Sequence, residues 1–114
     1  MSYSVDEAKI RVQQYADECF LVLNIPPIPV GWMYANVKRK WGHFRYGINT
    51  ETGELLQQEI MINVKMMERL KKWDKVRSTT LHEVAHYYQY FKLGYTDHGD
   101  KFWEMYQWLE RNIK

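Results

Sequence analysis

The chain has 114 residues, a formal net charge of +2, and 46% hydrophobic and 26% charged residues. These values are ordinary for a globular domain and exclude a disordered or collagen-like chain. No stretch approaches the roughly 18 consecutive apolar residues of a membrane span, and the first residues lack a secretory signal pattern. The single cysteine, Cys19, excludes a disulfide framework and a cysteine-based zinc ribbon. We therefore expect one domain over residues 1–114, a monomer without membrane contact in a reducing, cytoplasmic compartment.

The first predicted element is an amphipathic helix over residues 4–23. Ser4 and Glu7 form a capping box, and apolar residues recur at helical spacing from Val5 to Leu23. The proline-rich segment 24–29 ends this helix, because proline lacks the backbone donor.

The middle of the chain predicts a β-hairpin. Residues 41–48 are aromatic and partly alternating, residues 49–54 are rich in turn formers, and residues 58–64 form a second strand. The second strand is either an exposed sheet edge, to which an extended peptide could add, or an edge covered by the N-terminal helix. A short helix is expected over residues 66–73.

Two further helices are predicted in the C-terminal half. Asp74 is a candidate N-cap for a helix over residues 75–92, which ends at Gly94. A loop over residues 95–99 leads to a last helix over residues 100–112. Because helices and a small sheet follow one another in separate blocks, the predicted fold class is α+β.

The helix over residues 75–92 carries the sequence His82-Glu83-Val84-Ala85-His86. Its two histidines are four residues apart, so both imidazoles leave the same face and can converge on a Zn²⁺ ion. Glu83 is placed beside them, where a carboxylate can take a proton from the attacking water. This is the HExxH pattern of zinc metallopeptidases; the alternative is that these are ordinary helix residues.

A catalytic zinc needs a third protein ligand, and two candidates follow. His98 lies twelve positions after His86 and precedes Gly99, which permits a tight turn over the helix. Glu104 lies eighteen positions after His86 on the last helix. Lys92 stands where the metzincin spacing requires histidine, which excludes that class. We favour His98.

The HExxH motif and the later HGxxF element, His98-Gly99-Asp100-Lys101-Phe102, resemble the SprT-like (Spartan-type) zinc metallopeptidase family over about residues 30–110. The resemblance implies a zincin-like fold with zinc bound by His82, His86 and His98, and Glu83 as general acid/base. Many members carry a C-terminal zinc ribbon; its absence here predicts a minimal protease domain. The resemblance also makes DNA-associated proteins candidate substrates.

Other residues have competing interpretations. Asp97 or Asp100 could accept the second N–H of a zinc-binding imidazole, although Asp100 is the better candidate for capping the last helix. Aromatic residues cluster around the motif, and one tyrosine among them is a candidate oxyanion donor: Tyr87, Tyr88, Tyr90, Phe91 and Tyr95.

Basic residues occur in two groups interleaved with aromatics. They make single-stranded DNA a candidate partner, although short charge runs are usually solvated surface and tryptophans at such positions are more often core. The residues are Lys38, Arg39, Lys40, Arg45, Lys71, Lys72, Lys75 and Arg77, with Trp32, Tyr34, Trp41 and Trp73.

The sequence thus favours a zinc-dependent endopeptidase that acts on a protein or peptide substrate. The alternative is a DNA- or protein-binding module with a structural zinc site. Such a site is closed by a fourth ligand, for which Asp97 or His43 are the candidates.

Overall fold

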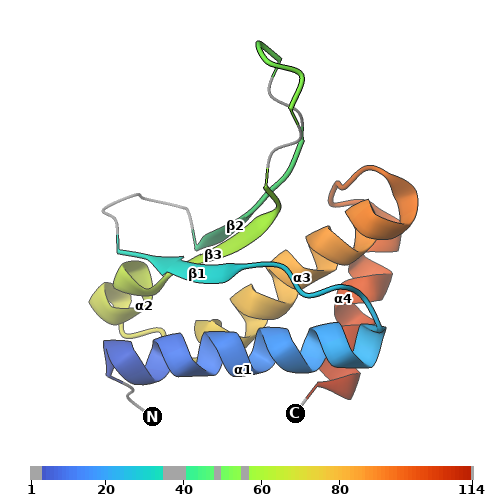
Figure 1. Cartoon of the computed structure of the whole chain (residues 1–114). Helices are drawn as coiled ribbons and strands as arrows, with labels where there is room; N and C mark the ends of the chain where they lie inside the picture. Colours follow the sequence, from blue (N-terminus) through green and yellow to red (C-terminus); the bar gives the residue numbers. More distant parts are fainter. Residues whose placement is uncertain (1–3, 35–40, 48–49, 55–56, 114) are drawn as a thin grey trace.

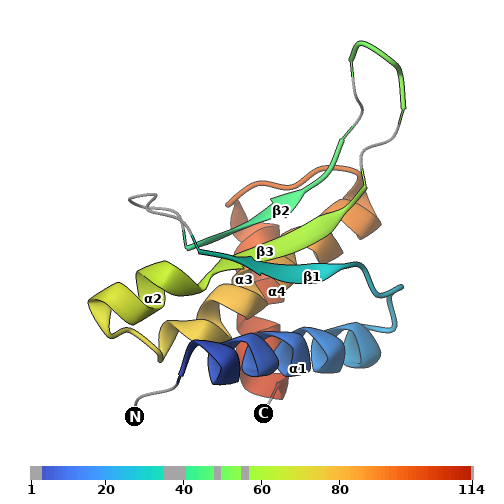
Figure 2. The same cartoon turned by 60° about the vertical axis from the view of Figure 1, so that its left-hand side comes forward.

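The computed structural model describes residues 4–34, 41–47, 50–54 and 57–113. Within them, four helices accompany a small three-stranded sheet, so the predicted α+β class is confirmed. The elements in chain order are α1 (Val5–Leu23), β1 (Val30–Met33), β2 (Gly42–Arg45), β3 (Glu59–Asn63), α2 (Val64–Leu70), α3 (Lys75–Leu93) and α4 (Asp100–Asn112). Both views show α1, α3 and α4 on one side of the sheet (Figures 1 and 2).

The sheet has the strand order β1-β3-β2, which places β3 in the centre. β3 pairs antiparallel with β2, as the predicted hairpin requires, and parallel with β1, with Trp32 opposite Ile62. The expectation that residues 58–64 form a sheet edge is therefore wrong, because β1 covers the side that the sequence left open. β1 escaped prediction because its four residues, VGWM, are too few to show an alternating pattern.

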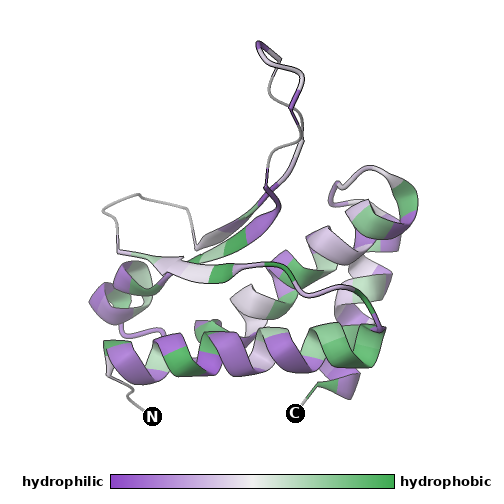
Figure 3. Ribbon diagram, viewed as in Figure 1, coloured by the Kyte–Doolittle hydropathy of each residue, from purple (hydrophilic) through white to green (hydrophobic). Residues whose placement is uncertain are grey.

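The core lies between the sheet and the helices. Val12 and Phe20 of α1, Ile60 and Ile62 of β3, and Val84 of α3 are all buried in it. Figure 3 shows hydrophilic and hydrophobic residues alternating along α1, as expected of a helix with one face on the core. None of the helices in the described ranges is both long and apolar enough to cross a membrane.

The first helix begins and ends as its sequence predicts. The hydroxyl of Ser4 accepts a hydrogen bond from the Glu7 N–H (3.1 Å), and Asn24 ends the helix in the left-handed conformation at φ 53°. Cys19 is fully buried on its inner face, and burial raises the pKa of this thiol to about 12. A thiol in this environment is unreactive.

α3 carries the HExxH motif, and only its C-terminal end is capped as the sequence predicts. Gly94 ends the helix at φ 78°, with its N–H donating to the Tyr90 carbonyl, as predicted. Asp74 occupies the N-cap position, but its side chain makes no capping hydrogen bond. α2 ends earlier than expected, at Leu70, because Lys71 adopts the left-handed conformation at φ 54°.

Arg77 fastens α4 to α3. Its guanidinium donates to the carbonyl oxygens of Glu110 (2.8 Å) and Ile113 (2.6 Å) and pairs with the Glu110 carboxylate (2.5 Å). Backbone carbonyls at a helix C-terminus lack intrahelical partners, so a cation there both satisfies and stabilises them. This clamp orients the helix that follows the third histidine.

We expect Gly42→Ala to lower the free energy of unfolding by about 1–3 kcal/mol, because overpacking forces the backbone to move. A Cβ at Gly42 would lie 2.8 Å from the Met61 carbonyl oxygen. Gly31→Ala is the matched control, because a Cβ there meets the far end of the flexible Met61 side chain, with the sulfur at 3.0 Å and the terminal carbon at 3.6 Å. Urea denaturation measures both variants; equal stabilities would contradict the expectation.

Candidate metal centre

Three histidine side chains meet where α3, the loop before α4 and β2 come together. His82 and His86 project from the same face of α3, and His98 approaches from the loop. The Nε2 atoms lie 3.2 Å apart for His82 and His86, 3.1 Å for His86 and His98, and 3.3 Å for His82 and His98. The three histidines named from the sequence thus form one cluster.

The spacing of these nitrogens suits a metal ion. Two zinc–nitrogen bonds of about 2.0–2.1 Å that meet at a tetrahedral angle place their nitrogens about 3.3–3.4 Å apart. The observed separations of 3.1–3.3 Å are close to that value for all three pairs. Imidazole nitrogen is also a preferred donor for divalent transition metals. The three side chains are therefore positioned to bind a metal ion.

Phe102 forms the floor beneath the three rings. It is fully buried, and its ring stacks on His86 with centroids 4.3 Å apart. Its centroid lies 4.9 Å from that of His82 and 5.1 Å from that of His98. Because one aromatic ring touches all three imidazoles, it restricts their rotation, which explains the phenylalanine of the HGxxF element.

The imidazoles on α3 are held in their neutral form. Burial, together with the neighbouring His82 and His98, lowers the pKa of His86 to about 4. Burial, followed by the proximity of His98, also lowers the pKa of His82. A neutral imidazole is the state that binds metal, so these side chains need not lose a proton at neutral pH.

The second ring nitrogen of His86 contacts a residue that the sequence did not indicate. Its Nδ1 lies 2.6 Å from the Thr96 hydroxyl oxygen. Asp97, one of the two predicted partners, instead accepts hydrogen bonds from the Gln89 side chain and the Gly99 N–H. The capping role expected for Asp100 is wrong, because Gly99 occupies the N-cap position of α4.

Glu104, the alternative third ligand, lies elsewhere. It lines a separate cavity with Tyr88 and Trp108, next to the end of α1, and is not part of the histidine cluster. His98 is therefore the residue that the fold brings to the pair on α3.

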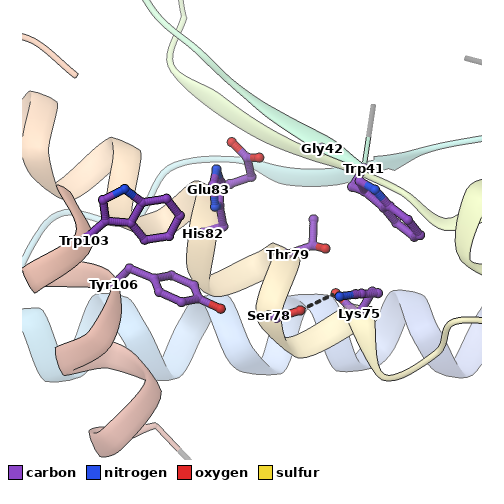
Figure 4. A pocket seen from close by; sticks show the side chains of 9 residues that line it. All are labelled: Trp41, Gly42, Lys75, Ser78, Thr79, His82, Glu83, Trp103 and Tyr106. Carbon is purple, nitrogen blue, oxygen red and sulfur yellow. Dashed lines mark hydrogen bonds between the residues drawn. The ribbon is translucent and has the colours of Figure 1, made fainter. Parts of the chain in front are cut away.

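Two cavities adjoin the cluster. One, of about 380 Å³, lies between Trp41 and Trp103, and Figure 4 shows Glu83 and His82 projecting from α3 beside it. The other, of about 370 Å³, is lined by all three histidines and by β2. Glu83 borders both cavities, although only 6% of its surface is exposed. It thus shares the first cavity with His82 and the second with all three histidines.

The tyrosines that line these cavities are not those of the predicted cluster. Tyr87 donates to the Pro26 carbonyl (2.6 Å), and Tyr90 packs against Phe44. The cavities are lined instead by Tyr46 and Tyr106. The spacing of Tyr106, four residues after the phenylalanine of the HGxxF element, could have indicated it. Burial and its hydrogen bond to Glu110 raise the pKa of Tyr106 to about 12.

Two of the basic residues are engaged in other contacts, whereas Lys71, Lys72 and Lys75 are exposed. Arg77 forms the clamp described above, Arg45 pairs with Glu59 (3.3 Å), and Trp73 is buried. Exposed aromatics do remain on and after β1, where lysine ammonium groups cover Trp32 and Tyr34. Residues 38–40, which are Lys38, Arg39 and Lys40, lie outside the described residues. Binding of single-stranded DNA stays a prediction.

The fold and site define a small α+β domain with a three-histidine group able to hold a metal ion. The model of the SprT-like family matches residues 8–113, nearly the whole sequence, and the chain belongs to this family. The family is associated with metallopeptidase-like domains. No curated protein and no solved structure matches the chain significantly.

The geometry predicts about one Zn²⁺ per chain. His98→Ala should lower zinc occupancy severely, because two ligands hold the ion far less well than three. Glu104→Ala should leave it unchanged. Elemental analysis of the purified variants measures the occupancy. Stoichiometric zinc in His98→Ala, together with its loss in Glu104→Ala, would transfer the third-ligand role to Glu104.

The lowered pKa of His86 predicts how the metal-free protein responds to acid. Folding moves this pKa from an ordinary 6.5 to about 4, so the unfolded chain binds more protons in that interval. The contribution to stability is complete above pH 6.5 and is lost as the pH falls towards 4. Thermal unfolding of metal-free protein should show this decline, and His86→Gln should flatten it. If the thermal stability of both proteins depends on pH in the same way, the decline does not come from the lowered pKa of His86.

Proposed function

We propose that the protein is a zinc-dependent endopeptidase with Glu83 as its general acid/base. The observation that carries the proposal is a buried carboxylate that borders the same two cavities as the cluster of three converging imidazoles. Family membership supports the same reading, because SprT-like domains are metallopeptidase-like.

In the proposed peptide hydrolysis, the metal and the side chains have different roles. When bound, Zn²⁺ would polarise the scissile carbonyl and lower the pKa of a water molecule. His82, His86 and His98 would hold the ion, and Phe102 restricts the rotation of their rings. Glu83 takes the proton from the attacking water and later gives it to the leaving amine. Its burial keeps the carboxylate in a fixed place for both transfers.

The number of ligands favours catalysis over a structural site. Structural zinc sites are closed by four protein ligands, whereas catalytic sites leave one position open. Among the described residues, the cluster contains the three histidines without a fourth ligand. Asp97, a candidate for closing it, is held by Gln89 and Gly99, and His43 is not in the cluster either. The alternative of a binding module with a structural zinc site is thus less well supported.

The outer strand β2 suggests how a substrate lies in the site. Among the residues that the structure describes, β2 pairs with β3 on one side only, and its residues Gly42 and Phe44 line the cavity of the three histidines. An extended peptide can add to such an edge through backbone hydrogen bonds, with little dependence on side chains. We therefore propose extended segments of proteins or peptides as substrates. That these are DNA-associated proteins, and that the protein is a cytoplasmic monomer, stay predictions.

The decisive variant is Glu83→Gln. An amide of nearly the same shape cannot accept the proton from the attacking water. We expect this variant to keep its zinc and its thermal stability and to lose cleavage of an unfolded protein by several orders of magnitude. The loss should fall mainly on kcat, because the proton transfers occur in the transition state.

Glu104→Gln is the matched control, because it makes the same chemical change on an exposed residue away from the histidine cluster. It should cleave at the wild-type rate. If Glu83→Gln cleaves as fast as this control while zinc is present, the peptidase assignment fails, and a binding module becomes the better interpretation.

A further inference from the structure

Gln89 is a polar residue in an apolar place. Its side chain is fully buried on α3, three residues after His86. It nevertheless makes three hydrogen bonds to the loop that carries His98. Its Nε2 donates to the Asp97 carboxylate (3.1 Å), and its Oε1 accepts from the Thr96 hydroxyl (3.0 Å) and the Asp97 N–H (3.0 Å). Replacing such a buried carboxamide lowers stability, because its hydrogen-bonding partners are left unsatisfied.

The partners of Gln89 leave its amide only one orientation. The backbone N–H of Asp97 can only donate, so the atom facing it must be the carbonyl oxygen. The Asp97 carboxylate can only accept when ionised, so the atom facing it must be the amide nitrogen.

The fixed amide determines where the hydroxyl proton of Thr96 points. That direction in turn determines which ring nitrogen of His86 carries a proton. The Thr96 hydroxyl has one proton, and the neighbouring Gln89 oxygen can only accept it. The hydroxyl oxygen therefore presents a lone pair to His86 Nδ1, 2.6 Å away, which must carry its own proton. In a neutral imidazole the other nitrogen is then unprotonated. His86 Nε2 is thus left with a lone pair directed at the nitrogens of His82 and His98.

The same amide also holds the loop of the third histidine. Asp97, which Gln89 contacts twice, accepts a further hydrogen bond from the Gly99 N–H (3.0 Å). The residues on both sides of His98 are therefore tied to one another and to α3. Because His98 is itself exposed, these contacts supply much of what restricts its position.

We propose that Gln89 and Thr96 are positioning residues that set the tautomer of His86 and the position of His98 before any metal binds. The proposal rests on the proposed function only in taking Zn²⁺ as the metal. Partners of this kind around metal ligands typically change metal affinity by about 10–100-fold when they are removed.

The test compares Thr96→Val with Thr96→Ser. Valine keeps the shape of threonine but removes the hydroxyl, whereas serine keeps the hydroxyl. Zinc affinity, measured by competition with a chromophoric chelator, should fall about 10–100-fold in Thr96→Val and stay at the wild-type value in Thr96→Ser. Thr80→Val is the matched control, because Thr80 is a buried threonine of α3 that bonds only the Val76 carbonyl of its own helix (2.7 Å).

A second readout needs neither metal nor cleavage. Nitrogen-15 NMR of the metal-free protein at neutral pH should show His86 protonated at Nδ1 in wild type and Thr96→Ser, and a mixture of tautomers in Thr96→Val. Gln89→Leu should do the same and weaken zinc binding further; if it fails to fold, the Thr96 pair still decides.

Wild-type zinc affinity in Thr96→Val, or an unchanged tautomer there, would overturn the proposal. Failure of the proposed function appears differently. In that case Glu83→Gln cleaves at the wild-type rate, while the tautomer and zinc affinity still respond to Thr96→Val.

Discussion

The convergence of three imidazole nitrogens within 3.1–3.3 Å of one another is the constraint on which the rest of the structure depends. Two of them are brought together by helix geometry alone, since residues four apart share a face. The third comes from a loop, which has no such geometry of its own. Tertiary contacts therefore hold the loop and its histidine in place. Phe102 packs below the rings, Gln89 bonds to the loop, and Arg77 binds the C-terminal end of α4.

The sheet forms the opposite wall of the cavities beside the histidine cluster. The central strand β3 is paired on both edges, so that β2 becomes the outer strand and borders the cavities beside Glu83. Gly42 brings β2 close to α3, because any larger residue would meet the Met61 backbone and the Thr79 side chain. A short strand, an open edge and a buried carboxylate thus lie together in a cleft of modest size.

Much of this arrangement could be predicted from local patterns. The helices over 4–23, 75–92 and 100–112 have apolar periodicity and clear ends, and α1, α3 and α4 match them within a residue or so. The histidine pair is a local pattern as well. The strand β1, the contact of His86 with Thr96 and the place of Tyr46 at a cavity could not be predicted in this way, because each depends on contacts between segments distant in sequence. Thr96 and Gln89 show this well: neither belongs to a motif, and they acquire a role only once the loop packs on α3.

The sequence by itself determined the chemistry available to this protein: two histidines and a glutamate on one helix, a third histidine before a glycine, and an α+β order of elements. Only the tertiary structure brought His98, and not Glu104, to the two histidines of α3, placed β3 in the centre of the sheet and made β2 an edge of it. The physical reason lies in the range of the interactions. Helical periodicity acts over four residues, whereas the choice of a third ligand and of a sheet edge depends on how α3, α4 and the strands pack around one core.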